Sequence, residues 1–208
     1  MPSTSKLLRP RLPRIAITLP DMGPLAGIVL ALVAFHVPNS LFVEPEPRVE
    51  VPISSGSGCG LRNDVYTITI DKKSHFFFGL SLDKRQYQTA IIERVAAAHG
   101  INLTTWQRGE LQKFPYMGMD VQQLPSYFAL PKAQRYALMK TGIPFGSNNN
   151  QLEEYIDAAR CIYTTQKGMP IFCSIRADVH TPFAPLRKLI NILQEQNINR
   201  FNLKTRMD

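Results

Sequence analysis

The clearest hydrophobic pattern in this 208-residue chain is an apolar stretch near its N-terminus. Residues 22–43 contain no Lys, Arg, Asp or Glu, and their most apolar part runs from Leu25 to Phe35. A helix of about 20 apolar residues crosses the ~30 Å hydrocarbon core of a bilayer. Clustered basic residues stay in the cytoplasm, and four of them precede Asp21 with no acid among them: Lys6, Arg9, Arg11 and Arg14. The pattern predicts a basic cytoplasmic tail over 1–20 and a transmembrane helix over 21–43.

Two other interpretations of this stretch remain open. A cleaved secretory signal peptide has a similar basic region and apolar region, and a buried helix of a soluble domain is also apolar. The stretch has no good small-x-small cleavage site, which favours an uncleaved anchor. We therefore expect a single-pass protein whose N-terminus is cytoplasmic and whose larger C-terminal part lies on the other side of the membrane.

After the apolar stretch, the composition predicts a tether followed by one folded domain. Residues 44–63 are rich in Pro, Gly and Ser, which favours a segment that is first extended and then flexible. Residues 64–208 are enough for one well-buried core.

Within residues 64–208, strand patterns and helix patterns follow one another. Residues 65–70 and 75–79 are rich in β-branched and aromatic residues and flank a polar turn, which predicts a hairpin. Helical spacing of apolar residues over 83–99 predicts a helix that ends at Gly100. The further predictions are an irregular insertion over 101–149 with a short helix at 132–140, a helix opened by a capping box at Asn150-x-x-Glu153, a strand over 171–177, a helix from Thr181-Pro182, and a strand over 200–206.

The predicted fold class is α+β. A strand–helix–strand unit buries its helix against one face of a sheet, so the domain should have two layers, a small sheet with helices on one face. Together with the apolar stretch, this gives one N-terminal transmembrane helix followed by a two-layer extracytoplasmic domain.

Charge and motifs narrow the function classes. The formal net charge is +8, but the basic residues do not cluster with aromatic residues, so a nucleic-acid partner is not expected. The four histidines are scattered, and the chain has neither a Gly-x-Ser-x-Gly motif nor a Walker loop. We therefore predict no enzyme activity, no catalytic residue, no metal and no cofactor.

The three cysteines allow several states. Cys161 and Cys173 fit small buried side chains, but an oxidising compartment also permits a Cys161–Cys173 bridge or a Cys59–Cys59 link between subunits.

Two segments carry a resemblance to a known family. One is Ile175-Arg-Ala-Asp178 with Thr181-Pro-Phe183, followed by a helix and a last strand. The other is Asp21-Met-Gly-Pro-Leu25 at the start of the apolar stretch. Over about residues 10–100 and 165–208 the chain resembles the ExbD/TolR family of energy-transducing subunits of the bacterial inner membrane. The resemblance implies that Asp178 forms a turn and makes a contact at the edge of a periplasmic domain.

The resemblance also implies partners. Members of this family place a dimer of their helices inside a polytopic ExbB- or TolQ-like pentamer. They use the proton-motive force to drive a TonB- or TolA-like transducer. We therefore expect a homodimer, or a heterodimer with an ExbD-like paralogue, in a complex that energises outer-membrane transport or other envelope processes.

The proton-carrying aspartate of the family falls at Gly27 in this chain. Glycine carries no proton, so the favoured hypothesis is an inactive subunit paired with an active paralogue. The other proton-path candidates are Asp21, which also fits a helix N-cap, and His36, which also fits the outer boundary of the membrane. A membrane-tethered periplasmic binding or scaffold module without motor activity is the alternative function.

Overall fold

The computed structural model of the chain contains two compact units, Met1–Val43 and Glu44–Asp208, which we describe separately. It describes residues 24, 26–32, 47–54, 66–80, 85–146, 149–167 and 172–207.

In the first unit, residue 24 and residues 26–32 are helical, and their side chains are exposed. The seven residues 26–32 span about 10 Å at ~1.5 Å per residue. None of the helices within the described ranges is both long enough and apolar enough to cross a bilayer. The predicted transmembrane helix over 21–43 is therefore wrong, and so is the predicted location as a single-pass inner-membrane protein with a periplasmic domain.

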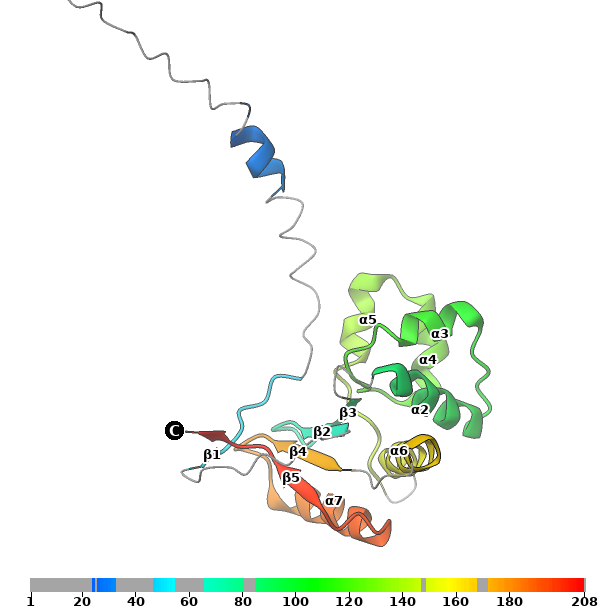
Figure 1. The fold of residues 1–208 in the computed structure, drawn as a ribbon, viewed down its shortest axis with the longest axis vertical. Coiled ribbons are helices and arrows are strands. Elements are labelled where there is room, and N and C mark those ends of the chain that lie inside the picture. Colours follow the sequence, from blue (N-terminus) through cyan, green and yellow to red (C-terminus); the bar gives the residue numbers. More distant parts are fainter. Residues whose placement is uncertain are drawn as a thin grey trace, which may run out of the picture. The chain divides into compact units, whose positions relative to one another are not determined.

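The second unit is built on a four-stranded mixed sheet with the order β3-β2-β4-β5 (Figure 1). The hairpin joins β2 and β3 antiparallel, whereas β4 lies parallel to both β2 and β5. Ile68 of β2 stands opposite Phe78 of β3 and Ile175 of β4. The strands are β2 (Tyr66–Ile70), β3 (Phe76–Leu80), β4 (Cys173–Ala177) and β5 (Phe201–Leu203).

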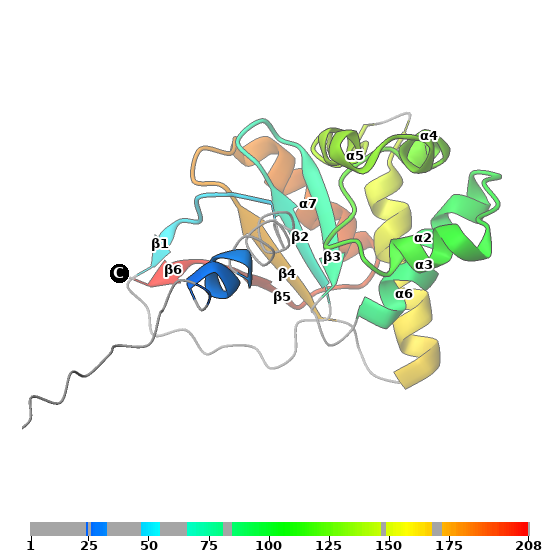
Figure 2. The same cartoon turned by 90° about the horizontal axis from the view of Figure 1, so that it is seen from above.

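Helices cover one face of this sheet, as the sequence predicts. Figures 1 and 2 show α7 (Phe183–Glu195) along this face, beside α6 (Gln151–Lys167). Tyr155 of α6 stacks on Phe78 with 5.7 Å between ring centroids, and Leu189 of α7 is fully buried in the same core. Helix α2 (Arg85–Ala98) packs against α6. The α+β class and the small sheet are as predicted.

The segment between α2 and α6 contains several short helices within its described residues, where the sequence predicted irregular structure with one short helix. Only the short helix expected at 132–140 corresponds to an element here, α5. The segment also pairs with the outer edge of the hairpin, through isolated bridges from Phe78 to Met117 and from Phe76 to Ile143. Its elements are α3 (Thr105–Leu111), the 3-10 helix η2 (Val121–Gln123), α4 (Leu124–Ala129) and α5 (Lys132–Leu138).

Two distant segments of the chain close the domain. Strand β1 (Ile53–Ser54) pairs in parallel with β6 (Arg206–Met207), and the Arg206 N–H donates to the Pro52 carbonyl at 2.9 Å. We call residues 47–54 the strap. Figure 2 shows β1 and α7 on opposite sides of the sheet.

Candidate functional site

The three residues singled out from the sequence do not form a site in the described part of the chain. Asp21 and His36 lie outside the described residues. Gly27 is helical and exposed, and nothing lies within 4 Å of the position that a Cβ atom would take. The structure therefore sets no steric limit on the side chain at position 27.

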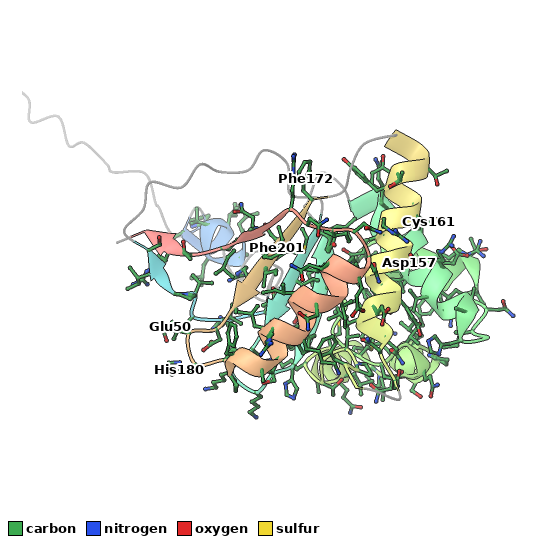
Figure 3. The ribbon with its side chains drawn as sticks, turned by 90° about the horizontal axis from the view of Figure 1, so that it is seen from below. Glu50, Asp157, Cys161, Phe172, His180 and Phe201 are labelled. Atoms are coloured by element: carbon green, nitrogen blue, oxygen red, sulfur yellow. The ribbon has the colours of Figure 1, made fainter. Side chains whose placement is uncertain are left out.

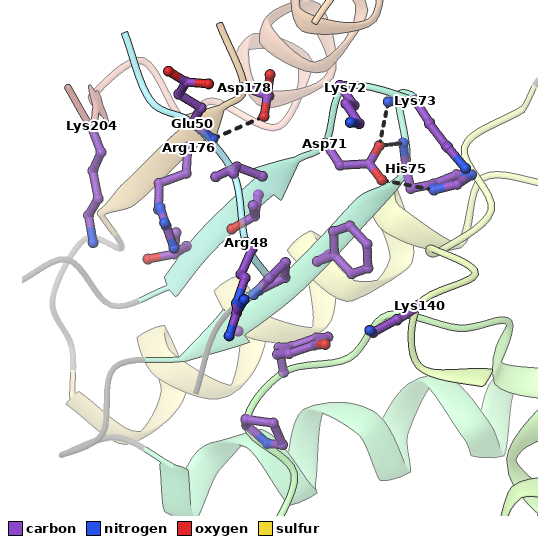
Figure 4. Close-up of a pocket in the computed structure, with 18 of the residues that line it drawn as sticks. Arg48, Glu50, Asp71, Lys72, Lys73, His75, Lys140, Arg176, Asp178 and Lys204 are labelled. Atoms are coloured by element: carbon purple, nitrogen blue, oxygen red, sulfur yellow. Dashed lines mark hydrogen bonds and ion pairs between the residues drawn. The ribbon is translucent and has the colours of Figure 1, made fainter. Parts of the chain in front are cut away.

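A cleft of about 1090 Å³ lies on the face of the sheet opposite α6 and α7 (Figure 4). Successive residues of a strand point to opposite faces. The residues between the buried isoleucines of β2, Thr67 and Thr69, therefore form the floor together with Phe77 and Gly79 of β3.

One wall of the cleft is an aromatic side chain held close to the sheet. The Tyr116 ring meets the Phe77 ring edge-on, with 5.6 Å between centroids. The neighbouring Met117 exchanges backbone hydrogen bonds of 2.6 and 2.8 Å with Phe78. A Cβ atom on Gly79 would lie 3.4 Å from the Cβ of Tyr116, so the glycine gives the wall room to approach.

The opposite wall is the strap. The Glu50 N–H donates to Oδ2 of Asp178 at 2.9 Å, and the Val179 N–H donates to the Glu50 carbonyl at 2.7 Å. Figure 3 shows Glu50 and His180 at the same end of the domain. Asp178 forms a turn and an edge contact, the role that the family resemblance implies for it.

Asp178 is almost buried, with 8% of its surface exposed, yet it favours the ionised form. Burial alone would raise the pKa of this carboxyl group. Hydrogen bonds from the backbone N–H groups of His180 and Glu50, and from the His180 ring, outweigh that effect and hold its pKa below the ordinary value. The carboxylate therefore carries its charge at neutral pH while it fixes the strap.

A second carboxylate, Asp71, shapes the hairpin turn at the same end of β2 and β4 as Asp178. Oδ1 of Asp71 accepts hydrogen bonds from the N–H groups of Lys73 and His75, at 2.9 and 2.8 Å. Its Oδ2 lies 3.0 Å from Nδ1 of His75. These bonds hold Ser74 in a left-handed conformation with φ of 64°.

The side chains that line the cleft are predominantly basic. Six Lys and Arg residues stand against three acids, and two of those acids, Asp71 and Asp178, make the internal bonds described above. Figure 4 shows two basic groups on opposite sides of the cleft. One group is Arg48, Arg176 and Lys204; the other is Lys72, Lys73 and Lys140, next to His75.

Cysteines and metal ligands do not add to this site. Cys161 on α6 is partly exposed and Cys173 is buried, and the Cys161–Cys173 bridge is not formed. Cys59 lies outside the described residues. Within the described ranges, no group of three or more His, Cys, Asp or Glu side chains is placed to hold a metal ion.

The sequence reasoning did not find the cleft. The sequence does indicate a polar face of the sheet, because Thr67, Thr69 and Arg176 alternate with apolar residues along the strands. Comparison with known proteins adds no assignment: no protein-family model, no curated protein and no solved structure matches the chain.

Proposed function

We propose that residues 47–207 form a non-enzymatic assembly domain of the ExbD/TolR type. In this proposal the domain pairs with a second chain of the same kind and joins an ExbB- or TolQ-like partner and a TonB- or TolA-like transducer. Because Gly27 has no ionisable group, other subunits would carry the protons that drive the complex. The proposal includes no membrane span in this chain.

The observation that carries the proposal is the arrangement of the C-terminal elements. Strand β4 ends at Ala177, Asp178 forms the turn, Pro182 caps α7, and β5 returns beside β4 in parallel. This is the order of strand, turn, proline-started helix and last strand that the family resemblance rests on. Because one fold can serve many functions, the assembly itself has to be measured.

Exposed apolar residues support pairing with a second copy. Strand β5 is at the edge of the sheet and pairs on its outer side with no strand in the described ranges. Unpaired edges and clustered apolar side chains are typical of surfaces that bind other chains. Large apolar side chains that are 46–69% exposed lie on β5, on the strap, in the turn after β4 and at the start of α7: Leu203, Ile53, Val179 and Phe183.

The test is the mass and composition of the complex formed by the tagged full chain. We expect a dimer by light scattering and co-purification of an ExbB- or TolQ-like partner from the native host. Val179→Lys together with Leu203→Lys should shift the dimer to monomer, because each buries a charge in the interface. Trp106→Gln, which removes an exposed apolar side chain from α3, is the matched control. A chain that is monomeric at all concentrations and retains no such partner would rule out the proposal.

A further inference from the structure

The cleft offers a second kind of binding that the assembly proposal does not require. We infer that the cleft binds an extended acidic peptide segment, whose carboxylates contact the two basic groups at its sides and whose apolar side chains lie against Phe77 and Tyr116.

The separation of the two basic groups determines how far apart the carboxylates of a bound peptide must be. Arg176 is in register with Thr69, near the strap, whereas Lys72 and Lys73 belong to the hairpin turn beyond Asp71. A strand rises ~3.3 Å per residue, so Lys72 lies about 10 Å further along the chain than Thr69, the partner of Arg176. Carboxylates about 10 Å apart on an extended chain can therefore contact one group each.

The acids of the cleft disfavour a polyanion of high charge density. Glu50 and Asp178 stand beside the first basic group, and Asp71 stands beside the second. A nucleic-acid strand presents a phosphate every ~3.4 Å and would bring negative charge next to these carboxylates. A peptide with widely spaced acidic residues places its charges beside the cations only.

The size and lining of the cleft fit a peptide. Its volume of about 1090 Å³ exceeds the range of roughly 300–1,000 Å³ that is typical of small-molecule pockets. The apolar part of the lining is large enough to receive side chains between the carboxylates, and aromatic groups with basic neighbours are common at peptide-binding surfaces. It consists of Pro47, Val49, Phe77, Leu80, Pro115 and Tyr116.

The test is fluorescence anisotropy with the purified full chain and a labelled nine-residue peptide, Glu-Ser-Val repeated three times. We expect saturable binding that weakens at least tenfold in 0.5 M NaCl, because the charges are partly exposed to solvent. The peptide with Gln in place of Glu should bind at least tenfold more weakly. Equal binding of the two peptides would refute the inference.

Paired variants locate the site. Arg176→Gln with Lys204→Gln, and separately Lys72→Gln with Lys140→Gln, should each weaken binding at least fivefold. Arg187→Gln with Lys188→Gln removes the same charge from exposed positions on α7, on the opposite side of the sheet, and should leave binding unchanged. Arg176→Lys should retain most of the affinity. Melting curves establish that each variant is folded.

Two further results would overturn the inference. Equal loss of affinity in the α7 control would mean that the peptide follows net charge and not the cleft. Tighter binding of a single-stranded oligonucleotide of similar length would assign the cleft to phosphate polymers. Because the assay uses the purified chain and a synthetic peptide, its outcome is independent of whether the chain co-purifies with an ExbB- or TolQ-like partner.

Discussion

Oδ2 of Asp178 accepts a hydrogen bond from the backbone N–H of Glu50 at 2.9 Å, across 128 positions of sequence. The bond joins the strap to the turn that follows the central parallel strand β4. Since the strap is one wall of the cleft, the shape of the cleft depends on this carboxylate.

Asp178→Asn should lower the free energy of unfolding by about 1–2 kcal/mol at pH 7, because an amide NH₂ would face N–H donors and the charge-assisted bonds would be lost. The pKa of Asp178 is lowered in the folded state, so its contribution is complete above the ordinary pKa near 4 and is lost as the pH falls through the folded value. The difference between wild type and variant, measured by urea denaturation, should therefore shrink below about pH 4.

Asp157→Asn is the matched control for that experiment. Asp157 forms an exposed ion pair with Arg160, which contributes at most about 1 kcal/mol. A control that loses as much stability as Asp178→Asn would contradict the role of the buried carboxylate.

Ile175→Asp should destabilise the domain by several kcal/mol, because Ile175 is fully buried between β2 and β5 and the carboxylate would have no partner. Ile70→Asp on β2 should have a similar effect, since this side chain is also fully buried. Leu203→Asp, at a position 46% exposed on β5, should cost less than about 1 kcal/mol. Denaturant unfolding measures all three. Wild-type-like stability of Ile175→Asp would be incompatible with the sheet.

Gly118→Ala should be destabilising by about 1–3 kcal/mol, because the new Cβ atom would overlap the Met139 carbonyl and the Phe77 ring. Gly109→Ala provides the opposite case. Gly109 lies within α3 with nothing within 4 Å of a Cβ atom, and alanine favours the helix by about 0.5–1 kcal/mol over glycine. The melting temperature should therefore fall in Gly118→Ala and rise in Gly109→Ala. A change in the same direction in both variants would argue against the packing of this segment.

Arg135→Lys should loosen the aromatic cluster around α3, α4 and α5. The Arg135 guanidinium donates to the carbonyls of Leu130 and Phe128, at 2.8 and 3.1 Å, and lies 5.9 Å from the centroid of the Trp106 ring. A lysine cannot make this forked contact, so a loss of about 1–3 kcal/mol is expected.

The fluorescence of Trp106, the single tryptophan in the chain, reports on this change and should shift in the folded variant. Arg108→Lys, at an exposed ion pair with Glu93, should change neither the spectrum nor the stability by a comparable amount. An unchanged spectrum in Arg135→Lys would disprove the contact.

The helices and strands with regularly spaced apolar residues could be predicted from the sequence, whereas most elements of the insertion could not. The hairpin, α2, α6, β4 and α7 lie within a few residues of their predicted bounds. In the insertion, Pro125 and Pro131 stand at the starts of α4 and α5, where the missing N–H of a proline costs nothing, so prolines do not mark irregular structure there.

Capping motifs also could be predicted only in part from the sequence. Asn150 was expected to form a capping box with Glu153. The structure has instead a bond from Nδ2 of Asn150 to the Glu153 carboxylate, at 2.7 Å, and Oδ1 of Asn150 has no partner. A complete capping box occurs at Thr104 and Gln107, where the Thr-x-x-Gln signature was present in the sequence.

The cleft was beyond sequence reasoning for a different reason. Its residues come from the strap, the hairpin, the loops around α3 and α5, and the two C-terminal strands. Local patterns indicate which face of a strand is polar, but they do not indicate which distant segment covers that face. Only the pairing of β1 with β6 and the bond between Asp178 and Glu50 bring Arg48 and Lys204 to the same cleft.

The pairing of Ile53 with Arg206 also determines when this domain can be completed during synthesis. About 150 residues separate the two partners, and a ribosome that adds ~5–20 residues per second takes about 8 to 30 s to deliver the second one. During that time β1 cannot pair with β6. The Glu50 N–H cannot donate its hydrogen bond until Asp178 has been synthesised. The hairpin and the insertion can begin to fold locally, but both walls of the cleft are in place only after β6 has been synthesised.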